Sequence, residues 1–364
     1  MSDLEQMKRR IGQRVIFGFP GTRIPTELAH LDEEWGIGGY VLFTRNLENF
    51  EQLMDLTEEL WTLGQGTPPF IGIDHEGGPV HRLPAPFTVF PDMAHLGQVS
   101  SVSVAYEVGA VIGRELTAAG FNLNFAPVLD LNTNPDNPII GRRAISDDPD
   151  RVASLARAVV RGLHDNAIIA CGKHFPGHGD THEDSHLTLP VCDLDLERLR
   201  ERELLPYREL IQKPPHLDMV MTAHVMYPKV DAEHMATTSR YLLQDVLRLE
   251  LGFKGLVVTD DLEMKAVVDR MGMEEVTIAA LEAGVDLFLV CHDIDRQVQV
   301  LETLLAQAEQ GKYPKHLWER GYRRVRDLKA RHFRVVRTVD RQHARELVGN
   351  REHIRIARRL KDGK

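Results

Sequence analysis

The 364-residue chain carries 44 Lys and Arg residues against 54 Asp and Glu residues, a formal net charge of −10. Its hydrophobic fraction of 43% is sufficient for a large core and excludes a disordered chain. The acidic balance argues against a dedicated nucleic-acid or anionic-membrane binder. No apolar run approaches the ~20 residues of a membrane span, and the first, Val15–Phe19, is too short for a signal peptide. We therefore expect a cytoplasmic protein without nucleic-acid or membrane partners.

Three cysteines lie far apart in the sequence, at Cys171, Cys192 and Cys291. Their number and spacing fit neither a disulfide framework nor a Cys-x-x-Cys metal site. We expect them to be reduced and to act as small apolar side chains, which agrees with a cytoplasmic location.

Eight short apolar runs recur along the chain, each bounded by polar residues, Gly or Pro. Most do not alternate, which is typical of strands buried on both faces of a parallel sheet. Longer segments between them have helical spacing, among them Val102–Ala119, Val152–Leu163, Leu194–Ile211 and Tyr241–Leu251. The eight runs are Val15–Phe19, Gly39–Phe43, Phe70–Ile73, Phe121–Ala126, Ile168–Cys171, Met219–Thr222, Leu256–Thr259 and Asp286–Val290.

This alternation predicts an α/β fold of the (β/α)8 TIM-barrel type, with a doubly wound open sheet as the alternative. No repeat or linker divides the chain, so we expect one catalytic domain over residues 1–335. From Arg320 to Lys364 the sequence has 16 Lys and Arg against 5 Asp and Glu, and the remainder has a net charge of −21. We expect residues 336–364 to form a basic helical tail packed on the acidic barrel, with a nucleic-acid arm as the alternative, and the protein to be a monomer.

Polar side chains follow five of the predicted strands. In barrel enzymes the catalytic groups lie at the carboxyl ends of the strands, so five such positions in register predict a polar pocket for a hydroxyl-rich substrate. The residues are Asp74 and Glu76 after the third run, Asp130, Arg142 and Arg143 after the fourth, Lys173 and His174 after the fifth, His224 after the sixth, and Asp260 and Asp261 after the seventh.

The segment from 173 to 186 contains histidines at four-residue intervals: His174, His178, His182 and His186. On a helix this spacing would align four imidazoles for a metal ion, which leaves a metal-dependent hydrolase as an alternative. Pro and Gly residues inside the run disfavour a helix, and a mobile active-site loop explains it better. Asp184 is close enough to orient His186 as a general acid/base.

Asp260 ends a strand-like run, where a carboxylate facing the pocket could attack an anomeric carbon. Phosphate-binding loops of the G-x-x-x-x-G-K-[ST] and G-x-G-x-x-G types do not occur after a strand. The strand end therefore favours glycoside chemistry.

Several motifs resemble family-three glycoside hydrolases, specifically their β-N-acetylhexosaminidase branch. Residues 173–186 match the signature K-H-F-P-G-H-G-D-T-x-x-D-S-H, which is highly specific. The shorter matches, which are moderately specific, are Ile73–Gly78, Asn134–Gly141, Val220–His224 and Gly252–Asp261, and the resemblance covers about residues 10–310.

The resemblance implies a (β/α)8 barrel and a retaining mechanism with no metal or cofactor. It implies that Asp260 is the nucleophile, His186 the general acid/base and Asp184 its dyad partner. The implied substrate is a terminal β-linked N-acetylglucosamine, typically on a muropeptide in cell-wall recycling. The positions that it implies for sugar binding are Asp74, Arg82, Arg143, Lys173 and His174.

The chain departs from the family pattern at the rim of this site. Pro79 stands where arginine is common, His75 and His81 where glutamine is common, and Ala144–Ile145 where serine-phenylalanine is usual. Because a histidine acid/base does not repel an anion, a phosphorylase acting on N-acetylglucosaminides is a further alternative.

Overall fold

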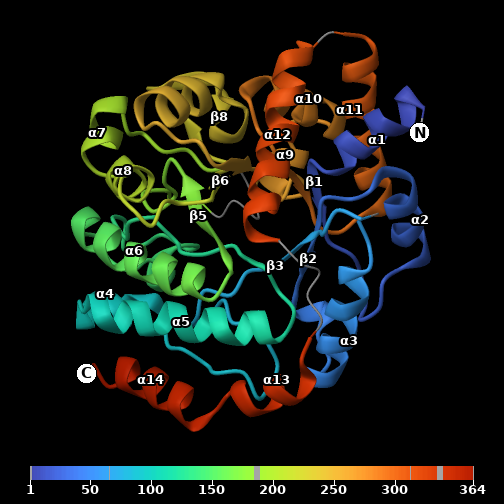
Figure 1. Ribbon diagram of the computed structural model, residues 1–364. Helices are drawn as coiled ribbons and strands as arrows, with labels where there is room; N and C mark the ends of the chain where they lie inside the picture. The colour runs from blue at the N-terminus through green and yellow to red at the C-terminus, as the bar shows by residue number, and fades with distance from the viewer. Residues whose placement is uncertain (1, 65, 184–188, 312, 334–338, 364) are drawn as a thin grey trace.

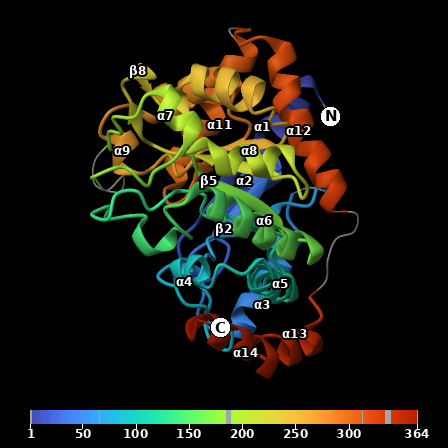
Figure 2. The ribbon, with the colours of Figure 1, turned by 90° about the vertical axis from the view of Figure 1, so that its left-hand side faces the viewer.

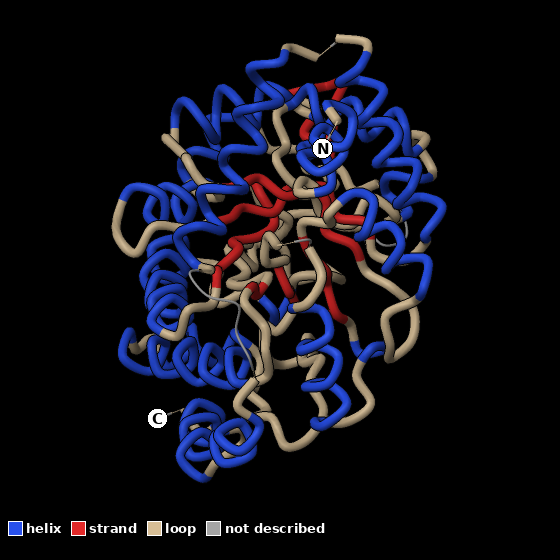
Figure 3. Tube along the Cα trace, turned by 45° about the vertical axis from the view of Figure 1, so that its right-hand side comes forward, coloured by secondary structure: helices blue, strands red, loops and turns tan. Residues whose placement is uncertain are grey.

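The computed structural model describes residues 2–64, 66–183, 189–311, 313–333 and 339–363. Eight parallel strands form one sheet in the order β10-β1-β2-β3-β4-β5-β6-β9, and a parallel pairing of Val258 with Leu287 closes it into a barrel. Helices surround the strands on all sides (Figures 1 and 3). The strands are β1 (Val15–Phe17), β2 (Gly39–Leu42), β3 (Phe70–Ile73), β4 (Leu123–Asn124), β5 (Ile169–Phe175), β6 (Met219–Thr222), β9 (Leu256–Val258) and β10 (Phe288–Val290).

The predicted (β/α)8 barrel is therefore confirmed, and each of the eight apolar runs coincides with one barrel strand over all or part of its length. A small antiparallel pair, β7 (Met226–Tyr227) and β8 (Asp231–Met235), was not predicted. No described helix is both long and apolar enough to cross a membrane. All three cysteines are buried and free.

The helices are α1 (Asp3–Gly12), α2 (Thr26–Trp35), α3 (Phe50–Trp61), α4 (Met93–Val99), α5 (Val102–Ala118), α6 (Pro149–Asp165), α7 (Leu196–Glu201), α8 (Leu204–Gln212), η4 (Tyr241–Glu250), α9 (Lys265–Val268), α10 (Met273–Ala283), α11 (Ile294–Glu309), α12 (Lys315–His332), α13 (Arg341–Leu347) and α14 (Arg351–Lys361), with short 3-10 turns η1 (Thr44–Asn46), η2 (Gly141–Arg143) and η3 (Ala236–Thr238).

Two sequence expectations about these elements were wrong. The strand predicted to end at Cys171 continues to Phe175, so that Lys173 and His174 are strand residues. The helix predicted over Leu194–Ile211 is broken into α7 and α8. At the break, Arg202 pairs with Asp180 at 3.3 Å, because the two residues between the helices turn toward the loop that follows β5.

Helix α12 closes the amino end of the barrel. Its Val325 and Leu328 belong to the same apolar cluster as the inward-facing side chains of the strands. The Lys329 ammonium donates hydrogen bonds to Gln13 Oε1 and to the Gly38 carbonyl, both at 2.7 Å, next to the start of β2. This end of the barrel is therefore filled by α12.

Helices α13 and α14 lie against the outside of the barrel, next to α5 and α4 (Figures 1 and 2). The His353 Nδ1 lies 2.7 Å from a Glu115 carboxylate oxygen, and both side chains are buried. The same carboxylate accepts the Gly349 N–H at 2.9 Å. Three basic residues of the two helices also pair with acidic residues of barrel helices: Arg341 with Asp55, Arg345 with Glu51, and Arg359 with Glu107.

Candidate active site

A cavity of about 430 Å³ opens at the carboxyl end of the barrel. Its wall includes every described residue to which the family resemblance assigns a role. Of the residues that follow the five predicted strands, Asp130, Arg142 and His224 do not line it. Asp184 and His186 lie outside the described residues. The predicted residues brought together in the cavity are Asp74, Arg82, Arg143, Lys173, His174 and Asp260.

Lys173 is the buried cation of the cavity, with only 2% of its side chain exposed. Its Nζ donates to Asp74 Oδ1 and to Glu76 Oε1, each at 2.6 Å. Burial by itself lowers the pKa of Lys173, but the two carboxylates more than offset burial and hold the pKa above its ordinary value. The ammonium therefore stays charged, and with two partners among the described residues one of its three N–H donors remains for a ligand.

Glu76 joins Lys173 to Arg143. Its two carboxylate oxygens accept from Arg143 Nε at 2.9 Å and Nη2 at 2.8 Å, a bidentate pair. Burial alone would raise the pKa of Glu76, but the Lys173 and Arg143 cations outweigh it and keep the pKa far below its usual range. The sequence placed Glu76 at a strand end but gave no sign that it contacts two cations distant along the chain.

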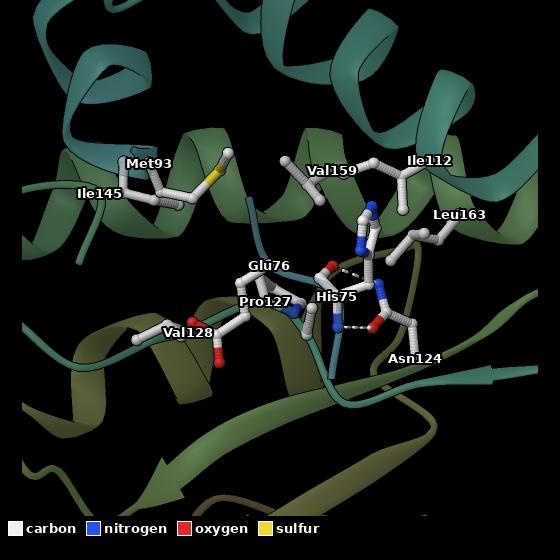
Figure 4. Close-up of a pocket in the computed structure, with 11 residues that line it drawn as sticks. His75, Glu76, Met93, Ile112, Asn124, Pro127, Val128, Ile145, Val159 and Leu163 are labelled. Atoms are coloured by element: carbon white, nitrogen blue, oxygen red, sulfur yellow. Dashed lines mark hydrogen bonds between the residues drawn. The ribbon is translucent and has the colours of Figure 1, made fainter. Parts of the chain in front are cut away.

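The side chain of Asn124 fixes the backbone between Asp74 and Glu76 (Figure 4). Its Oδ1 accepts the N–H of His75 at 3.0 Å, and its Nδ2 donates to the His75 carbonyl at 2.9 Å. Because β4 is only two residues long, this amide continues the hydrogen bonding that a longer strand would supply. The His75 ring packs among aliphatic side chains (Figure 4), and burial, then the neighbouring His81, lowers its pKa to about 3.

Asp130 orients His174. Its carboxylate accepts the His174 backbone N–H at 3.1 Å, the His178 backbone N–H at 2.7 Å and the His174 Nδ1 at 2.6 Å. Burial raises the pKa of Asp130, but the His174 ring and these hydrogen bonds lower it by more than burial raises it. The net pKa is below its ordinary value, so Asp130 is the ionised acceptor. In the neutral imidazole, Nδ1 therefore carries the proton and Nε2 presents a lone pair.

Asp260 follows β9, and its Oδ1 accepts the N–H of Asp261 at 2.8 Å. Burial raises the pKa of Asp260, while the His174 and His224 rings, this N–H and Lys173 lower it by more. The net effect keeps the carboxylate ionised at neutral pH, which a nucleophile requires. His224 is itself buried, which lowers its pKa, and its Nε2 lies 3.1 Å from the Asp261 carbonyl.

The histidine run does not form a helix in its described part, because it leaves β5 as a loop after Phe175. Across the described ranges, no group of three or more His, Cys, Asp and Glu side chains is arranged to hold a metal ion. The three described histidines contact different partners: His174 contacts Asp130, His178 contacts Thr181, and His182 contacts Asn134.

Comparison with known proteins identifies the family. The model of the glycosyl hydrolase family 3 N terminal domain matches residues 6–328. A beta-hexosaminidase of Idiomarina loihiensis is 38% identical over 300 residues, which cover 81% of this chain and 89% of that protein. A beta-hexosaminidase of Neisseria meningitidis is 41% identical over 267 residues, 71% of this chain and 72% of that protein.

Solved structures agree with this assignment. A family 3 beta-N-acetylglucosaminidase from Paenibacillus superposes with a TM-score of 0.90 at 39% identity, over 98% of this chain and 68% of that one. NagZ from Neisseria gonorrhoeae, in complex with N-trifluoroacetyl-D-glucosamine, superposes with a TM-score of 0.78 at 31% identity, over 96% and 97% of the two chains. The chain thus belongs to glycosyl hydrolase family 3, and it is a glycoside hydrolase built on a (β/α)8 barrel.

Proposed function

We propose that this protein is a retaining exo-β-N-acetylglucosaminidase. The observation that carries the proposal is the ionised Asp260 carboxylate in one cavity with Lys173 and His174. A retaining glycosidase needs such a nucleophile beside groups that hold the sugar hydroxyls. The relatives named beta-hexosaminidase and beta-N-acetylglucosaminidase support the sugar specificity.

In the first step, Asp260 attacks the anomeric carbon while the bond from that carbon to the leaving oxygen breaks. The leaving oxygen takes a proton from His186, and a covalent glycosyl-Asp260 ester forms. In the second step, His186 removes a proton from water, the water oxygen bonds to the anomeric carbon, and the Asp260 carboxylate is released. Two displacements retain the β configuration. Asp184 orients the imidazole; the roles of Asp184 and His186 rest on the family resemblance of residues 173–186.

The sugar is held by charged groups that are already paired. Lys173 has one N–H donor left, and His174 presents its Nε2 lone pair, so a hydroxyl can accept from the first and donate to the second. Asp74, Arg82 and Arg143 complete the wall. We propose that the natural substrate is a terminal N-acetylglucosamine on a muropeptide, which the protein cleaves as a cytoplasmic monomer in cell-wall recycling.

The test compares wild type, Asp260→Ala and the exposed-residue control Asp245→Ala on 4-nitrophenyl N-acetyl-β-glucosaminide. We expect Asp260→Ala to lose at least about 10³-fold in kcat, because it removes the nucleophile, and Asp245→Ala to retain wild-type activity. NMR of the first product should show the β anomer, with N-acetylglucosamine as the product whether or not phosphate is added. A chelator should leave the rate unchanged. Equal rates for wild type and Asp260→Ala would contradict the proposal, and loss of activity with a chelator would favour the metal-dependent alternative.

A further inference from the structure

His292 presents an exposed imidazole at the rim of the active-site cavity. It follows β10, and 54% of its side chain is exposed. The residue lines the active-site cavity and also a second cavity of about 520 Å³, between the loop after β1 and the start of α11.

Two contacts hold this exposed ring in place, and the Glu263 carboxylate holds its main chain. It stacks on Phe43 with a centroid separation of 5.9 Å and an interplanar angle of 27°. Its Nε2 lies 3.4 Å from Asp261 Oδ2. The Glu263 carboxylate accepts the backbone N–H groups of His292 and Asp293, which fixes the main chain under the ring.

The partners of the ring are themselves fixed. The Arg45 guanidinium lies 4.4 Å from the centroid of the Phe43 ring and donates to the Phe19 carbonyl at 3.1 Å. Asp261 Oδ1 accepts the N–H of Cys291 at 3.2 Å, so its carboxylate is tied to the same turn as His292. An exposed side chain usually gains little from such ordering, whereas a binding platform depends on it.

We propose that His292 is the platform for a second pyranose ring, the leaving-group sugar. His292 contacts Asp261. Asp261 directly follows Asp260 in the sequence, and Asp260 is the group that attacks the anomeric carbon. The faces of aromatic rings carry partial negative charge and attract the C–H groups of a pyranose face. His292 also lines the second cavity. This inference rests on the proposed function and adds a residue that binds the leaving group.

The experiment compares two substrates that share the first sugar. Methyl N-acetyl-β-glucosaminide has no ring in its leaving group, and N,N′-diacetylchitobiose has a pyranose there. For His292→Ala we expect kcat/KM on the disaccharide to fall by roughly three- to tenfold, while kcat/KM on the methyl glycoside changes by less than about twofold. His292→Phe restores the aromatic face and should recover most of the activity on the disaccharide. His316→Ala, which removes an exposed histidine of α12, is the control and should match wild type on both.

Equal losses on both substrates would assign His292 a structural role and overturn the platform, as would an unchanged kcat/KM on the disaccharide. Failure of His292→Phe to recover any activity would contradict the stacking argument. If the wild type cleaves neither substrate, the proposed function fails, and the platform fails with it. If the wild type cleaves both substrates but His292→Ala changes kcat/KM on both by the same factor, the platform is overturned and the proposed function stands.

Discussion

Replacing Glu76 by Gln tests how the cavity is held together. The change keeps the shape of the side chain but removes the charge that accepts three hydrogen bonds, one from Lys173 and two from Arg143. Lys173 is 2% exposed and Glu76 2%, so solvent cannot replace the lost charge. Removing one partner of a buried ion pair costs about 3–5 kcal/mol, and we expect Glu76→Gln to lose about 3 kcal/mol in free energy of unfolding.

The same substitution should reduce catalysis, because it releases both cations from their fixed positions. A displacement of about 1 Å in a positioning group costs about 10²-fold, so we expect kcat/KM to fall by about that factor. Loss of one carboxylate also removes part of what raises the pKa of Lys173, so the pKa of this ammonium should fall.

The assays are urea denaturation followed by circular dichroism, and the pH dependence of kcat/KM on the nitrophenyl glycoside. The exposed Glu275→Gln on α10 is the matched control and should behave as wild type. Wild-type stability together with wild-type kcat/KM in Glu76→Gln would refute the reasoning that Glu76 fixes the two cations.

Three further predictions follow from other contacts. Asp130→Asn should lower kcat/KM by about 10–100-fold with little change in stability, because an amide no longer fixes which ring nitrogen of His174 carries the proton. Unaltered kinetics would contradict that role. His353→Ala should lower the free energy of unfolding by about 2–3 kcal/mol, since it removes a hydrogen-bond partner of the buried Glu115 carboxylate, while kcat of the folded enzyme stays constant; a wild-type urea midpoint would show that this contact does not anchor the tail. The pKa of Glu76 is depressed in the folded protein, so its contribution to stability is complete above the unfolded value of about 4.3 and is lost as the pH falls below it. The stability difference between wild type and Glu76→Gln should accordingly be constant from about pH 5 to 8 and shrink below about pH 4, and a difference that grows in acid would be inconsistent with an ionised Glu76.

The sequence predicts the barrel well because each strand is a local apolar run, and periodicity reports local burial. It also indicates which strand ends carry charged groups. It does not indicate which groups pair, because Glu76 and Arg143 are separated by 67 residues and Lys173 and Asp74 by 99. The register of the strands around the barrel decides these pairs, and nothing local encodes it.

Other features escape sequence reasoning for a related reason. At the break between α7 and α8, Arg202 pairs with Asp180, in a loop that precedes it in the chain. In the sequence, His292 cannot be told apart from another surface histidine. Its contacts with Phe43 and Asp261 distinguish it in the structure. Such positions become visible only after distant segments are brought together.

The four charges of Lys173, Arg143, Asp74 and Glu76 sum to zero within one buried group. A group without net charge has no long-range monopole field, so by itself it adds little electrostatic steering to the approach of a ligand. Salt screens exposed charges over about 8 Å at physiological ionic strength, but it screens buried pairs such as these much less. Recognition by this group therefore stays nearly independent of ionic strength, although every member of it is charged.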